Sequence, residues 1–387
     1  MSYLRRLSTR NLIVLAVAVL AVASGGTAIA VAAGGGGPAP PPKPLDEAIH
    51  DALAANTPDG VTARVKFTNK LFPTGALEGQ LGSALMSGAS GRLWATNDGR
   101  GRIELQSNAG DVQIVWSPKT ISVYDASSNT VYRADLPAGA DRASSSDTRE
   151  APALSEIDKF LGELGMHWAI SSADPTDVAG RPAYSVAVSP KHDGGLLGSV
   201  ELAWDAVYGT PLRVGIRAQN DTSPVLELAV TDISYGSVPA VDVDVSPPAG
   251  VKVVDLGSRS SLPDKASNTP AVNGLDAVKA AAAFPVVAPE PVVGLPRRSV
   301  RLVGGDTAIV LYGQGLGGLA LIERKADASG PGKQLSGLPT VSLDGLTAHE
   351  LATQLGTVLE WQSGGTGFVL AGSLPPAAAE TAARAVK

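Results

Sequence analysis

The residues of this chain that could do chemistry are few and scattered. The sharpest motif is Gly-Gln-Gly-Leu-Gly-Gly at residues 313–318, a G-x-G-x-x-G pattern that follows a strand-like segment. Where such glycines open the helix of a βαβ unit, backbone N–H groups bind pyrophosphate at the helix N-terminus. Here the sequence continues as another strand at residues 319–322. We therefore interpret the glycines as a hairpin turn.

The other candidate groups are isolated. The histidines at positions 50, 167, 192 and 349 lack the i, i+4 spacing of a zinc-binding helix. Ser90 lies in Gly-Ala-Ser-Gly, which lacks the second glycine of the G-x-S-x-G nucleophile motif. With 37 acidic residues, some pair of carboxylates is expected anywhere, so spacing cannot support glycosidase chemistry. We expect a protein that is not an enzyme and that uses no cofactor and no metal.

The N-terminus predicts export. Three arginines in the first ten residues precede residues 12–33, which carry no charge and would form a helix about 33 Å long, enough to cross a bilayer. The basic flank should stay in the cytoplasm, which places everything after residue 43 outside. Ala-Ile-Ala at residues 28–30 is also an acceptable cleavage site. Both a single N-terminal membrane span with extracytoplasmic domains and a secreted protein with a cleaved signal peptide stay open.

Composition excludes several kinds of site. The chain has no cysteine, which rules out disulfides, a thioether-linked lipid anchor and cysteine nucleophiles. Its net charge of −6 becomes −9 when the three N-terminal arginines are set aside, so the exported part is not expected to bind nucleic acid through phosphate contacts. Residues 34–44 are rich in glycine and proline and cannot build a core, so we interpret them as a stalk.

Alternation of apolar and polar residues begins at residue 60 and dominates the next 175 residues or so. Short turns join the alternating segments, which predicts an antiparallel meander with one dry face. The expected strands lie at residues 60–68, 91–96, 102–107, 112–116, 120–125, 130–135, 167–171, 183–189, 199–204, 211–218 and 225–235.

Two helices accompany this meander. The first spans residues 46–55. The second begins at Ser155, which with Asp158 resembles a capping box, and it ends at Gly165 after an apolar stripe at helical spacing. The serine-rich, charged residues 138–152 precede the second helix as a surface loop that could gate a binding site.

A second break in composition, at residues 257–270, predicts a linker. Beyond it we expect helices at residues 275–284, near 346–355 and after 376, with strands at 299–303, 307–312, 319–325, 357–361 and 367–371. The predicted division is thus a signal peptide or anchor (1–33), a stalk (34–44), a large β domain (45–255), a linker (256–272) and a small α+β domain (273–387).

The dry face of the large domain allows two interpretations. A sheet of ten or eleven strands tends to curl, and helices over its open side could enclose an apolar cavity suited to acyl chains. The same side chains could equally fill an ordinary core. The candidate cavity-lining residues are Val65, Phe67, Leu93, Leu105, Ile114, Trp116 and Val123 from strands, and Leu154, Phe160, Leu161 and Leu164 from the second helix.

Several segments resemble one known superfamily. They are GVTARVKFTNKLF (60–72), GRLWATNDGRGRIELQSNAGDVQIVW (91–116), VYDASSNTVYRADLP (123–137) and LAWDAVYGTPLRV (202–214). With them the chain resembles the superfamily of the lipoprotein carrier LolA and the sigma-factor regulators RseB and MucB, particularly actinobacterial-type members. The resemblance covers roughly residues 45–250. The region after the linker, with DTAIVLYGQGLGGLALIERK (306–325), is similar to the small second domain of RseB-like proteins.

The resemblance implies an α+β protein whose large domain is an unclosed antiparallel β-barrel with covering helices. Its cavity would receive lipid or lipoprotein acyl chains. Our first hypothesis is therefore a membrane-tethered, extracytoplasmic, non-catalytic protein that binds a lipid or an acylated ligand. The second is an RseB/MucB-like regulatory sensor that binds the exported part of an anti-sigma factor or another membrane protein. The third is an envelope scaffold with a filled core.

Overall fold

The computed structural model describes residues 39–71, 84–136, 152–192, 194–255, 272–326 and 338–386. The predicted anchor or signal segment lies outside these residues, as do nearly all of the predicted loop and linker, so those expectations stay predictions. Within the described residues, no helix is long and apolar enough to span a membrane.

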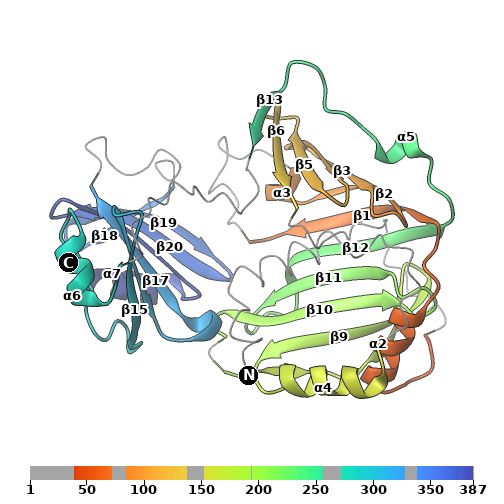
Figure 1. The fold of residues 1–387 in the computed structure, drawn as a ribbon, viewed down its shortest axis with the longest axis horizontal. Coiled ribbons are helices and arrows are strands. Elements are labelled where there is room, and N and C mark those ends of the chain that lie inside the picture. Colours follow the sequence, from red (N-terminus) through yellow and green to blue (C-terminus); the bar gives the residue numbers. More distant parts are fainter. Residues whose placement is uncertain are drawn as a thin grey trace.

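The first of two β-sheets is the larger one (Figure 1). Its strands are β1 (Gly60–Asn69), β2 (Ala89–Thr96), β3 (Gly101–Ser107), β4 (Gly110–Trp116), β5 (Thr120–Asp125), β6 (Thr130–Asp135), β7 (Trp168–Ile170), β8 (Asp174–Val178), β9 (Arg181–Pro190), β10 (Leu197–Asp205), β11 (Pro211–Ala218), β12 (Pro224–Tyr235) and β13 (Lys252–Asp255). They form one 13-stranded sheet in the order β13-β6-β5-β4-β3-β2-β1-β12-β11-β10-β9-β7, with β8 paired to β9.

Two antiparallel meanders meet in this sheet. β1 pairs with β12, from Val61 opposite Tyr235 to Asn69 opposite Leu226, and this pairing joins the β1–β6 meander to the β9–β12 meander. The end strands β13 and β7 belong to opposite edges, so the sheet is open. The fold is therefore mostly sheet, with six α-helices in the described part of the chain.

Two expectations about this sheet were wrong. It has 13 strands rather than ten or eleven. The sequence of β8, Asp-Pro-Thr-Asp-Val, is made of residues that favour turns, and β13 has only four residues, too few to show an alternating pattern. The sheet is also not purely antiparallel. β13 pairs with β6 in parallel, because the chain crosses from the end of β12 to the far edge of the sheet before β13 begins.

Four helices belong to this sheet: α2 (Leu45–Ala54), α3 (Ala84–Ser87), α4 (Leu154–Leu164) and α5 (Ala240–Val243). α2 and α4 pack against each other at the β9 end of the sheet (Figure 1). α4 ends as predicted, with the N–H of Gly165 bonded to the carbonyl of Leu161 at 2.8 Å. The predicted capping box does not form, because Ala153 occupies the N-cap and no side chain caps the helix.

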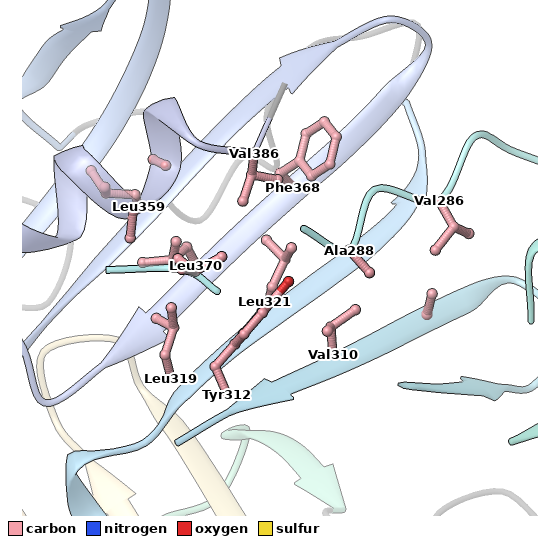
Figure 2. Close-up of a cluster of buried hydrophobic side chains, with 14 of the residues drawn as sticks. Val286, Ala288, Val310, Tyr312, Leu319, Leu321, Leu359, Phe368, Leu370 and Val386 are labelled. Atoms are coloured by element: carbon pink, nitrogen blue, oxygen red, sulfur yellow. The ribbon is translucent and has the colours of Figure 1, made fainter. Parts of the chain in front are cut away.

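The second sheet has eight antiparallel strands. They are β14 (Val272–Asn273), β15 (Arg297–Val303), β16 (Thr307–Tyr312), β17 (Leu319–Lys325), β18 (Thr340–Leu343), β19 (Leu346–Thr353), β20 (Gly356–Ser363) and β21 (Thr366–Gly372), in the order β14-β15-β16-β17-β21-β20-β19-β18. Helices α6 (Leu275–Ala281) and α7 (Pro376–Arg384) share its core, where Trp361 stacks on Phe368 with ring centroids 5.1 Å apart. Figure 2 shows part of this core.

The helix expected near residues 346–355 was wrong, since this segment is β19. Its helix-forming residues pair instead with β18 and β20, because Asp344 and Gly345, at φ 51° and 95°, reverse the chain in a tight hairpin. The glycines at residues 313–318 do form the predicted turn. They contain the short 3-10 helix η4 (Gly315–Gly317), and Tyr312 before them pairs with Leu319 after them.

Candidate functional site

The seven strand residues predicted to line a cavity lie in one apolar cluster on the β1–β5 face. Val65, Leu93, Leu105 and Trp116 are buried, and Phe67, Ile114 and Val123 pack against them half-buried. We call this set, together with Ala84, Leu85, Ala89, Ala95, Ile103, Val112, Ile121 and Leu228, the meander cluster. The alternation of the strands brings these side chains to one face, as predicted.

The helix that covers this cluster is α3. Ala84 is fully buried in the cluster and Leu85 packs on it half-buried, over β1, β3 and β4. Asn69 at the end of β1 fixes the helix, because its Nδ2 donates to the carbonyl of Leu85 at 2.7 Å. α3 was not predicted from the sequence, because Ala-Leu-Met-Ser at residues 84–87 shows no helical period.

The four helix residues predicted to line the same cavity lie elsewhere. They belong to α4, which packs on α2, and none is part of the meander cluster. Leu154 and Phe160 are 42% and 61% exposed, Leu161 and Leu164 are half-buried, and Ile157 is buried. The apolar stripe of α4 therefore packs against α2, and Leu154 and Phe160 at its edges face solvent.

The pockets near the cluster are polar. One of about 270 Å³ is lined by Trp116 together with Ser117, Ser122, Arg100 and Asp244, among others. Another of about 320 Å³ is lined by Gly91, Arg92, Glu104 and Gln106. Neither reaches the other six predicted strand residues. Buried side chains of the meander cluster pack against one another, so an apolar ligand must move α3 or these side chains to enter it.

A segment around α5 covers the opposite face of the same strands. Arg102 lies 5.0 Å from the ring centroid of Trp94, and its Nη1 donates to the carbonyl of Asp242 at 3.2 Å. Arg100 bonds Asp244 at 2.5 Å and Asp98 at 2.8 Å. The Arg100 guanidinium, helped by the Thr96 hydroxyl, lowers the pKa of Asp98 to about 2. α5 contacts β2 and β3, and α3 contacts β1, β3 and β4 from the other face, so β3 is covered on both sides.

The corner LAWDAVYGTPLRV is built around one buried carboxylate. Asp205 is 0% exposed, and its Oδ2 accepts bonds of 2.8 Å from Arg181 Nε and from the Tyr235 hydroxyl. Its Oδ1 accepts from the N–H groups of Val207 and Tyr208. Burial acts to raise the pKa of Asp205, but these donors outweigh it and the pKa is lowered. Because every oxygen has partners, the corner is structural.

No group of histidine and acidic residues in the described part of the chain could hold a metal ion. The four histidines lie apart on different elements or turns, at positions 50, 167, 192 and 349.

No family model and no curated protein matches the chain. Several solved structures match it. The chain is similar to MucB in the structure of the Pseudomonas aeruginosa MucA/MucB complex, with 17% identity and a TM-score of 0.41, over 89% of this chain and 98% of that one. A second MucB structure, in complex with MucA(peri), gives 17% identity and a TM-score of 0.39, over 89% and 96% of the two chains.

Shorter structures match about half of the chain. A putative outer membrane lipoprotein-sorting protein domain from Vibrio parahaemolyticus is 11% identical, with a TM-score of 0.24, over 52% of this chain and 96% of that one. A LolA superfamily protein from Nitrosomonas europaea is 8% identical, with a TM-score of 0.23, over 52% of this chain and 98% of that one. At such identities and TM-scores these matches carry no argument for a function, which has to rest on the residues of this chain.

Proposed function

We propose that this chain is a membrane-tethered, extracytoplasmic, non-catalytic binding protein whose meander cluster receives a lipid or an acyl chain. The main support for this proposal is the way in which α3 covers the meander cluster. In the described residues, the helix on this apolar face of β1, β3 and β4 is α3, with four residues, and Phe67, Ile114, Ile121 and Val123 around it stay half-buried.

The free energies of burying apolar groups favour the exchange of α3 for an acyl chain. Exposing a side chain the size of Leu85 costs about 1.5–3 kcal/mol, whereas each methylene of a ligand that becomes buried contributes about 0.8 kcal/mol. About four methylenes therefore offset the exposure of one such side chain. A palmitoyl chain has enough methylenes to replace the apolar contacts that Ala84 and Leu85 make in this cluster.

The test uses the absence of cysteine, which makes any introduced thiol unique. In the full chain in lipid nanodiscs, Val123→Cys places a thiol in the meander cluster, and Ser122→Cys places one on the other face of β5 as the matched control. The probe is a synthetic dipalmitoylated lipopeptide. We expect it to slow maleimide modification at position 123 at least tenfold and to leave position 122 unchanged.

The same peptide without acyl chains should protect neither thiol. Equal modification rates at position 123 with and without the lipopeptide would refute the lipid-binding proposal.

A second candidate function is supported by α4. Phe160 and Met166 are 61% and 60% exposed, and Glu156 and Glu163 lie within one helical turn of Phe160. Exposed apolar side chains beside carboxylates fit a protein segment with apolar and basic residues. MucB is named as the partner of MucA in its solved complex. We propose as the alternative that α4 binds the exported segment of a membrane protein such as an anti-sigma factor.

This candidate is tested with a photoreactive benzoylphenylalanine at position 160 in native membranes. The control is the same residue at position 241 on α5, where Val241 is 75% exposed. A crosslink from position 160 alone to a single-span membrane protein is the expected result. Crosslinks of equal yield from both positions, or none from position 160, would contradict it.

A further inference from the structure

Residues 284–292 form an extended segment across the core of the second sheet. Phe284, Val286, Ala288 and Val292 in it are 7%, 8%, 8% and 0% exposed. Figure 2 shows Val286 and Ala288 on the same side of the strands as Val310 and Leu321. We call these nine residues the clasp segment. Val292 pairs with Leu295 in an isolated β-bridge, and the other eight residues lie in no helix or strand that would satisfy their backbone polar groups.

Side chains from three strands hold the clasp segment by its backbone. The Thr366 hydroxyl of β21 donates to the carbonyl of Pro285 at 3.0 Å. The Glu323 carboxyl of β17 accepts at Oε2 from the N–H of Val287 at 2.8 Å. Arg297 of β15 donates through Nη1 to the carbonyl of Ala288. Of these three contacts, the one from the Val287 N–H depends on the Glu323 carboxyl, a group that titrates.

Glu323 is held in an unusual environment. It is 0% exposed, and its Oε1 has no hydrogen-bond partner among the described residues. The buried hydroxyl of Tyr312 also has none there, and in Figure 2 it points towards Leu321. Burial raises the pKa of Glu323 to about 7, opposed only in part by the Val287 N–H and by Lys279. The carboxyl therefore changes charge near neutral pH.

The charged groups around it do not neutralise an ionised Glu323. Arg297 is engaged by Glu290 at 2.7 Å and by the carbonyl of Ala288. Lys279 of α6 acts on Glu323 only through its electric field, and burial and the charge of Glu323 raise the pKa of Tyr312. An ionised carboxylate with one unpartnered oxygen is unfavourable in such a core. The clasp segment is the layer whose movement would admit water to it.

We propose that Glu323 is a proton-operated latch for the clasp segment, which lies closed over the second sheet while the carboxyl is protonated and opens when it ionises. This inference does not depend on what the meander cluster binds. It makes the second sheet a sensor of the pH of the solution around it.

The test is hydrogen–deuterium exchange of residues 284–292 in the full chain between pH 5.5 and 8.5, corrected for intrinsic exchange rates. Opening should be linked to the ionisation of a group whose pKa is about 7 when closed and near its ordinary 4.5 when open to water. This linkage predicts a loss of protection of roughly 30-fold over this range.

Glu323→Gln keeps the acceptor for Val287 but cannot ionise, so its protection should not change with pH. Glu350→Gln is the control, since burial also raises the pKa of Glu350 on β19, and it should keep the wild-type profile. If Glu323→Gln does not fold, Glu323→Met replaces it. A wild-type protection that is constant with pH, or a Glu323 variant that retains the full pH dependence, would overturn the proposal.

Discussion

At the residue scale, the groups that hold this molecule together are side chains bonded to backbone. Asp205 closes the β10–β11 corner and Asn69 fixes α3. Ser373 receives the N–H of Leu196 at 2.8 Å and donates to Leu355. Each such group is short and polar, and each fastens one segment of backbone to another. Their loss should therefore act on particular elements.

Asp205→Ala should destabilise the first sheet by about 3–5 kcal/mol, because it leaves Arg181, the Tyr235 hydroxyl and two backbone N–H groups without their acceptor. Glu201→Ala, which removes the part-exposed ion pair with Arg217, should cost less than about 1 kcal/mol. Urea unfolding followed by circular dichroism measures both.

The pH dependence of the Asp205 effect has a definite sign. The pKa of Asp205 is lowered in the folded protein, so its contribution is present above the unfolded pKa near 3.8 and is lost as pH falls through the lower folded value. Wild type and Asp205→Ala should therefore differ by a constant amount above about pH 5 and converge in strong acid. A difference that grows with rising pH would contradict this role.

At the element scale, the two predicted groups of lining residues should respond differently to truncation. Leu93→Ala on β2, at 0% exposed, should cost about 2–5 kcal/mol because it opens a cavity in the meander cluster. Phe160→Ala on α4, at 61% exposed, should change stability by no more than about 0.5 kcal/mol. Thermal unfolding of the two variants compares them, and a large loss at Phe160 would mean that α4 is buried.

Some of the strands and helices could be predicted from the sequence, and others could not. Alternation placed β5, β6, β11, β16 and β17 at their observed bounds, because each has one dry face and short turns at both ends. It could not place α3, which is held by Asn69 rather than by a periodic pattern. It also mistook β19 for a helix, because its alanine and leucine residues favour helix while the pairing with β20 decides the outcome.

The residues of the candidate site also differ in whether the sequence could place them. The seven strand residues could be grouped from their period alone, since alternate residues of paired strands must share a face. The four α4 residues could not be placed, because a helical stripe shows that a face is covered without showing by what. Glu323 gave no sequence signal, since it differs from other acidic residues only in its burial.

At the scale of the whole molecule, a tight turn of the first sheet contacts Ser373 after the last strand of the second sheet. Gly195, at φ +59°, lies between β9 and β10, and a Cβ there would come within 2.5 Å of the Ser373 Cβ. Gly195→Val should therefore push the sheets apart while leaving each folded. Spin labels on Thr222→Cys and Arg298→Cys, in the otherwise cysteine-free chain, measure the separation. An unchanged distance distribution would show that this contact does not set the arrangement.

The central claim, that the meander cluster receives an acyl chain, is tested most directly by native mass spectrometry of the full chain. The chain is purified from its own membranes in a non-ionic detergent that is removed in the gas phase. We expect bound mass of acyl-lipid size that is lost on organic extraction and reduced in Leu105→Asp, if that variant keeps its circular dichroism spectrum. An unliganded mass, unchanged after incubation with lipids from the same membranes, would contradict it.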